Sequence, residues 1–364
     1  MIKRISLFLA AFLSAMILFS QDYIACARSD KEWGYINREG KYVINPQFEH
    51  VKDFSEGVAA VRTGGQWGFV DKTGKYIVNP QFESAESFHD GLAAVKSGKE
   101  WGYIDKTGSH IVNPQFEYAH DFINGNAFIR SHGVWGMIDK EGKYVINPQF
   151  DNIRDFKEGL APFLKGKVWG YMDMVGKYIV NPQFEKAESF SEGLARVRKS
   201  GQWGYIDKNG NYVINPQFDD AHDFVGGMAA VRKGKDWGFI GKDGKYVINP
   251  QFYDVRDFQG DVAAVRLGSE WGFADKSGKF IINPQFTNVS EFTEGLAAVK
   301  LAKEWGYIDA EGKIAINPQF ETARPFLDGM ARVQLGGNIG WIDKSGNYVI
   351  NPQFPNAKDF VKVE

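Results

Sequence analysis

Residues 67–82 read W-G-F-V-D-K-T-G-K-Y-I-V-N-P-Q-F, and this stretch returns along the chain every 34 residues. Trp-Gly opens nine copies, and a tenth, altered copy reads Ile339-Gly340-Trp341. Asn-Pro-Gln-Phe closes every copy. Since a fixed period without insertions is the signature of tandem repeats, the sequence predicts one repeat domain over residues 28–364. Its ten repeats start near residues 33, 67, 101, 135, 169, 203, 237, 271, 305 and 339, and the last is truncated.

The first half of each repeat predicts a β-hairpin. Residues 67–71 are aromatic and β-branched, which favours a strand. Asp71-Lys72-Thr73-Gly74 is typical of a type I turn, in which Asp bonds back to the backbone and Gly takes the left-handed conformation. Residues 75–79 then form the return strand, which we expect Pro80 to end because proline cannot donate to a sheet ladder.

The second half predicts a buried corner and a short third strand. Phe82, Ala85 and Phe88 are three apart, which fits one 3₁₀ turn or an irregular loop. Residues 92–96 follow as a strand that leads into the next Trp-Gly. Helical repeats of the same period are excluded, because proline and repeated glycines would break every helix. The sequence therefore predicts an all-β array of about three short strands per repeat, in which neighbours must complete each core.

The ends of the chain favour an open array over a closed one. No third-strand sequence is apparent before Trp33, and the chain stops at 361–364, where the last third strand should start. A propeller usually closes by pairing strands from both ends in one blade, and blades normally have four strands. We therefore expect an open β-solenoid or superhelix, with a closed β-propeller as the alternative.

Residues 1–27 differ from the repeats and resemble a secretory signal peptide. Lys3 and Arg4 precede an apolar run over 5–19, and Ala25-Cys26-Ala27 resembles a cleavage site. We expect cleavage after Ala27 and an extracytoplasmic location, whether periplasmic, secreted or surface-attached. Ile24-Ala25-Cys26 also resembles the end of a lipobox, so lipidation of Cys26, the only cysteine, is an alternative in which the lipid would be the attachment to the membrane. An uncleaved membrane anchor is another.

Composition and motifs point away from catalysis. The net charge of -2 shows no basic excess of the kind that nucleic acid requires. The turn carboxylates recur once per repeat, as structural residues do, and the six histidines share no ligand spacing, so neither a metal site nor a catalytic site is expected. No phosphate-binding loop or cofactor motif is present, so no cofactor is expected. An enzyme would need a polar cluster confined to a few repeats, and none is apparent.

Two recurring side chains are candidate binding features. The tryptophans could stack on sugars, although a buried ladder is the favoured interpretation. Lysines at the hairpin tips would align as a stripe for a partner or an anionic envelope polymer, although a solvated edge that prevents aggregation is favoured. This lysine stripe comprises Lys41, Lys75, Lys143, Lys177, Lys245, Lys279 and Lys313.

The recurring W-G-[YF]-[IV]-D-K-x-G-K-[YF]-[VI]-I-N-P-Q-F resembles the WG-repeat family of bacterial proteins from Trp33 to the C-terminus. The resemblance implies a tandem β-repeat with a binding or structural role and no catalytic residues. We therefore expect an exported, non-catalytic binding or scaffold module with a protein or peptide partner. The alternative is a module that binds a cell-envelope glycan or anionic polymer.

Overall fold

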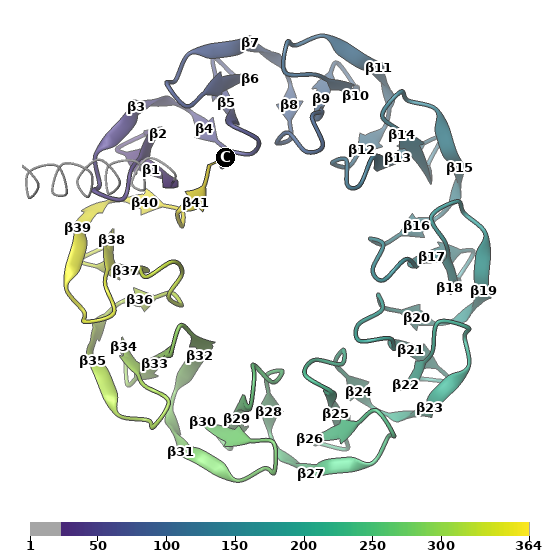
Figure 1. The fold of residues 1–364 in the computed structure, drawn as a ribbon, viewed down its shortest axis with the longest axis vertical. Helices are drawn as coiled ribbons and strands as arrows, with labels where there is room; N and C mark the ends of the chain where they lie inside the picture. The colour runs from purple at the N-terminus through teal and green to yellow at the C-terminus, as the bar shows by residue number, and fades with distance from the viewer. Residues whose placement is uncertain (1–22, 364) are drawn as a thin grey trace, which may run out of the picture. The chain divides into compact units, whose positions relative to one another are not determined.

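The structure, a computed structural model, describes residues 23–363, and all of their regular structure is β-strand (Figure 1). No helix of that part of the chain is long and apolar enough to cross a membrane. The chain divides into two compact parts. The first runs up to Pro148 and includes 334–342 and 347–364, and the second comprises 149–333 and 343–346.

The strands form antiparallel sheets, called blades here, of four strands in chain order. The blades from residue 50 to 150 consist of β4 (His50–Val51), β5 (Val58–Thr63), β6 (Gln66–Asp71) and β7 (Tyr76–Phe82); β8 (Ser84–Ala85), β9 (Ala93–Ser97), β10 (Glu100–Ile104) and β11 (His110–Phe116); and β12 (Tyr118–Ala119), β13 (Asn126–Ser131), β14 (Val134–Asp139) and β15 (Tyr144–Phe150).

The next blades follow the same plan (Figure 1). They consist of β16 (Asn152–Ile153), β17 (Ala161–Lys165), β18 (Val168–Met172) and β19 (Tyr178–Phe184); β20 (Lys186–Ala187), β21 (Ala195–Lys199), β22 (Gln202–Ile206) and β23 (Tyr212–Phe218); β24 (Asp220–Ala221), β25 (Met228–Lys233), β26 (Asp236–Gly241) and β27 (Tyr246–Phe252); β28 (Asp254–Val255), β29 (Val262–Leu267), β30 (Glu270–Asp275) and β31 (Phe280–Phe286); β32 (Asn288–Thr293), β33 (Leu296–Leu301), β34 (Glu304–Ile308) and β35 (Ile314–Phe320); and β36 (Thr322–Ala323), β37 (Ala331–Leu335), β38 (Asn338–Ile342) and β39 (Tyr348–Phe354).

Over residues 23–363, nine blades have four strands rather than the expected three, and the blade that contains both ends of the described chain has five. The predicted corner contains a two-residue strand, as in β8, which pairs with β9 through Ser84↔Lys96 and Ala85↔Val95. The hairpin and the third strand are confirmed. The turn is also confirmed, because Asp71 Oδ1 accepts the Thr73 and Lys75 N–H groups and Gly74 has φ +83°.

The prediction that Pro80 ends the return strand is wrong, because β7 continues to Phe82. The ladder shifts register between Trp67↔Phe82 and Phe69↔Val78, which leaves Gly68 opposite Pro80 in a bulge. β7 is the edge strand of its blade, so proline removes no donor that the ladder needs.

The prediction of an open array is wrong. The strand pairing shows the alternative, a closed array. β1 (Tyr23–Ser29) pairs with β2 (Glu32–Ile36), and also with β40 (Asn356–Ala357) and β41 (Val361–Lys362). β3 (Tyr42–Phe48) completes this sheet, so one blade contains strands from both ends of the chain. This pairing is how β-propellers close.

The apolar cores lie between consecutive blades. One cluster joins Phe69 and Val78 of β6 and β7 to Phe88, Val95 and Ile104 of the next blade. A single repeat therefore cannot bury its apolar residues alone, as the sequence predicts. The tryptophans lie at the margins of such clusters and are buried or half-buried.

Candidate functional site

The repeats differ in the side chains on the surface of the short first strand of each blade. Two exposed or half-buried positions define this first-strand surface: the residue that opens the short strand and the residue that directly follows it. The opening residues are His50, Ser84, Tyr118, Asn152, Lys186, Asp220, Asp254, Asn288, Thr322 and Asn356. The following residues are Lys52, Glu86, His120, Arg154, Glu188, His222, Arg256, Ser290, Arg324 and Lys358, of which Ser290 is buried.

Buried tyrosines hold the backbone of this variable surface in place. The Tyr171 hydroxyl donates to the carbonyl oxygen of Glu188 at 2.8 Å, and the Tyr205 hydroxyl donates to that of His222 at 2.7 Å. Tyr35, Tyr103 and Tyr307 make the same contact in other blades. In these five blades the same residue thus fixes the main chain, while the side chains that it presents vary.

These tyrosines predict that the protein loses stability in alkali. Burial raises the pKa of Tyr171 and Tyr205 far above the ordinary value of about 10. Above about pH 10 the unfolded chain therefore releases tyrosine protons that the folded chain keeps, so the free energy of unfolding falls as pH rises. Melting temperatures measured from pH 8 to 12 should fall, together with tyrosine absorbance changes at 295 nm. Tyr171→Phe should make the fall shallower, and an unchanged slope would contradict this account.

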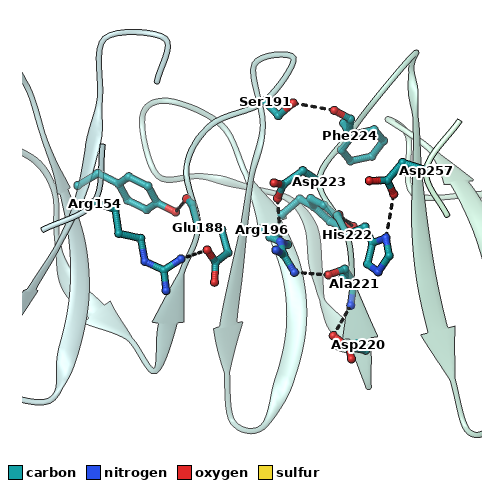
Figure 2. A network of polar contacts seen from close by, with 12 residues as sticks. Arg154, Glu188, Ser191, Arg196, Asp220, Ala221, His222, Asp223, Phe224 and Asp257 are labelled. Carbon is teal, nitrogen blue, oxygen red and sulfur yellow. Dashed lines mark hydrogen bonds and ion pairs between the residues drawn. The ribbon is translucent and has the colours of Figure 1, made fainter. Parts of the chain in front are cut away.

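In the second compact part, charged side chains join consecutive blades into a polar network (Figure 2). Arg154 Nη1 contacts Glu188 Oε2 of the next blade. Arg196, on β21, donates from Nε to Asp223 Oδ1 at 2.7 Å and from Nη1 to the carbonyl oxygen of Ala221. Burial, and then the nearby Arg196 guanidinium, lower the pKa of Arg154, so the two cations lie within electrostatic reach of each other.

The network continues to the following blade through a histidine. His222 Nδ1 lies 2.8 Å from Asp257 Oδ1 (Figure 2). Ser191 Oγ donates to the carbonyl oxygen of Phe224 at 2.7 Å and links the two blades that the Arg196–Asp223 contact also joins. Side chains of the network are 19–39% exposed, so each is held by a protein partner and also reaches solvent.

Part of this polar network recurs in the first compact part, where Lys52 Nζ contacts Glu86 Oε2 at the positions equivalent to Arg154 and Glu188. Arg196 occupies a strand position at which Ala60, Ala94, Ala230 and Ala264 stand in other repeats. The sequence signal was a departure from the consensus inside a predicted strand, and spacing along the chain could not reveal it because the partners lie about one repeat apart.

A separate set of contacts between blades is structural. Glu158 Oε2 lies 3.1 Å from Lys208 Nζ in the next blade, and the Glu158 carboxylate also accepts the Gly193 N–H. Glu192 and Lys242 repeat this arrangement one blade later. Where Gly260 stands at the position of the acid, Ala310 stands at the position of the lysine.

The lysine stripe lies at the hairpin tips, where all seven side chains are exposed. Lys41 contacts Glu39 in its own turn, and Lys245 contacts Asp243 in the same way. These acidic neighbours favour the solvated-edge interpretation. A partner on the stripe stays a prediction.

Cys26 lies in β1, and its side chain is buried beside Asp53, with 3.1 Å between Sγ and Oδ1. Burial, followed by the charge of Asp53, raises the pKa of the thiol. A lipid on Sγ would not fit in this packed position, so a lipidated Cys26 and the paired strand β1 exclude each other. Among residues 23–363 no group of three or more His, Cys, Asp or Glu side chains could hold a metal ion.

Comparison with solved structures shows likeness of fold alone. A crystal structure of "the eukaryotic initiation factor" matches 93% of this chain and 97% of that chain at 12% identity, with a TM-score of 0.55. Dihydro-heme d1 dehydrogenase NirN in complex with DHE matches 94% of this chain and 75% of that chain at 12% identity, with a TM-score of 0.41. No curated protein sequence matches the chain.

The family model described as "WG containing repeat" matches ten consecutive stretches. These are residues 33–67, 67–100, 101–134, 135–169, 169–203, 203–235, 237–271, 271–303, 305–338 and 339–362. Nearly all of the described chain is covered, and the repeat boundaries agree with those predicted from the Trp-Gly period. The chain therefore belongs to the WG-repeat family.

Proposed function

We propose that this protein is an exported, non-catalytic binding or scaffold module whose partner is a protein or peptide. The observation that carries the proposal is the first-strand surface, on which side chains vary from blade to blade while the framework beneath them repeats. A structural array without a partner would have no use for such variation.

The polar network in the second compact part is the proposed contact for the partner. Its arginines are fixed by carboxylates and keep part of their surface open to solvent. Arginine is enriched at the energetic centres of interfaces, and a side chain fixed in advance loses little entropy on binding. The charges of both signs suit a polar protein surface better than a uniform polyanion.

Catalysis has weaker support than binding. Arg154, Arg196 and His222 are each engaged by a carboxylate of a neighbouring blade, which holds them in place. The proposed location outside the cytoplasm rests on the signal-like segment at residues 1–27, of which residues 1–22 lie outside the described residues.

The test is cross-linking of the protein in its native envelope fraction, followed by mass spectrometry of the linked peptides. A triple variant, Arg154→Ser, Arg196→Ala and His222→Ser, introduces residues that other repeats carry at the equivalent positions, such as Ser290 and Ala230. We expect it to keep its melting temperature and to recover at least about tenfold less partner, since each arginine at an interface centre is worth more than about 1 kcal/mol.

The matched control replaces Lys143, Lys177 and Lys245 by Asn, the residue found at Asn211 and Asn347. It should bind the partner as the unchanged protein does. Loss of the partner in the lysine variant alone would move the contact to the hairpin tips. Equal recovery by all three proteins would refute the role of the network.

A further inference from the structure

Tyr118 is an exposed residue at a position where no other repeat has Tyr, Trp or Phe. It opens β12, on the first-strand surface, and is 45% exposed. The equivalent residues in the other repeats are His50 and eight smaller or charged polar residues. Burial in a core therefore does not account for Tyr118, and the feature belongs to one blade of the first compact part.

Tyr118 is the outer ring of a cluster of four aromatic rings from two consecutive blades. Its centroid lies 5.8 Å from Trp101 and 5.8 Å from Trp135. His120, the next residue of the first-strand surface, lies 5.2 Å from Tyr118 and 5.1 Å from Trp135. The rings pack edge-to-face or tilted against one another and leave no space between them for a cation. The cluster is thus a platform with an exposed ring and not a cage.

Polar groups adjoin this platform. Arg130 lies opposite Tyr118 in the β12–β13 pair, and its Nε is 3.9 Å from Glu117 Oε2, which is too long for a strong ion pair. Asp121 follows His120, but its Oδ1 is out of contact with solvent and its Oδ2 lies 3.5 Å from His89 Nε2, so it is not counted as an acceptor for a ligand. An exposed ring flanked by a guanidinium matches the way proteins bind saccharides, where ring faces stack on aromatic side chains and hydroxyls bond to polar ones.

We infer that Tyr118, supported by His120 and Trp135, stacks against the pyranose ring of a neutral saccharide, with Arg130 as a donor to its hydroxyls. Nucleic acid would also stack on aromatic rings, but its phosphates would meet the carboxylates of Glu86, Glu117 and Asp121, which already engage the nearby cations Lys52 and Arg130. This saccharide site is distinct from the polar network. The result of its test therefore says nothing for or against the proposed protein partner.

The experiment is isothermal titration of the full protein with four neutral trisaccharides: chitotriose, cellotriose, maltotriose and mannotriose. We expect at least one to bind and to change the tryptophan fluorescence. Tyr118→Asn, which copies Asn152 of the next repeat, should weaken that binding at least about tenfold, the size of effect seen for loss of an aromatic stacking partner. Tyr118→Phe keeps the ring and should bind nearly as well as the unchanged protein.

The matched control is Tyr253→Thr, which removes another exposed tyrosine and copies Thr287 of the following repeat. Its 59% exposed ring contacts the Arg266 guanidinium rather than an aromatic cluster, so saccharide binding should persist. The inference is overturned if none of the four sugars binds. It is also overturned if Tyr118→Asn binds as well as the unchanged protein, or if Tyr253→Thr loses binding and Tyr118→Asn does not.

Discussion

A chain that begins at Arg28 should be less stable than a chain that begins at Tyr23 by about 5 kcal/mol, the combined cost of losing one buried Ile side chain and three smaller ones. The shorter chain lacks five of the seven residues of β1 (Tyr23–Ser29). Ile24, Ala25, Cys26 and Ala27 are buried, and they are among the residues removed. The blade that joins the two ends of the chain should then lose its cohesion.

The strand pairing explains the size of this effect. β1 forms five residue pairs with β2 and further pairs with β40 and β41, so its loss removes the strand that pairs with β40 and β41 and leaves β2 paired with β3 alone. The backbone N–H of Lys358 also loses its acceptor, the carbonyl oxygen of Cys26. Unpaired strand edges favour association with other chains, so aggregation should accompany the loss of stability.

Urea unfolding of the two chains, followed by circular dichroism, measures the difference directly. Cys26→Ala in the longer chain is the control, because Ala60 occupies the equivalent position in the next repeat and the strand remains. It should cost far less than the truncation. Equal stability of the two chains would contradict the role of β1, and cleavage after Ala27 would then be compatible with the fold.

The sequence contained β1, but another interpretation concealed it. Residues 24–29 match the third strand of the next repeat, residues 58–63, in residue type at every position. The two stretches read Ile24-Ala25-Cys26-Ala27-Arg28-Ser29 and Val58-Ala59-Ala60-Val61-Arg62-Thr63. The same small apolar residues resemble a signal cleavage site, and that interpretation assigned them to a removed segment. Once they are read as a strand, both ends contribute to one blade, and the closed array follows from the sequence.

Other parts of the fold could be predicted from the sequence when their contacts join residues that are close together in the chain. The Asp71 turn and the hairpin depend on neighbours in sequence, and they were predicted correctly. The two-residue strands such as β8 are too short to show alternation, so they were missed. The Arg154–Glu188 and Arg196–Asp223 contacts lie between blades, and only the packing of one repeat on the next brings them together.

The glycine of the Trp-Gly motif should be the least replaceable residue of a repeat. A Cβ added to Gly68 would lie 2.6 Å from the Val78 carbonyl oxygen and 2.6 Å from the Pro80 nitrogen. Both are backbone atoms, which cannot turn aside as a flexible side chain can. The bulge that brings Pro80 against Gly68 therefore requires the two motif residues together, and this explains why Trp-Gly and Asn-Pro recur as a pair.

Gly68→Ala should destabilise the protein by about 3 kcal/mol or more, the upper range for overpacking a fixed backbone. Gly64→Ala is the matched control, because no atom lies within 4 Å of the added Cβ and Ala302 already occupies the equivalent turn position at φ 52°. It should cost only about 1 kcal/mol for the left-handed conformation. Urea unfolding of both variants separates the two causes. If the two substitutions cost the same, backbone conformation rather than the contact with Pro80 would account for the glycine of Trp-Gly.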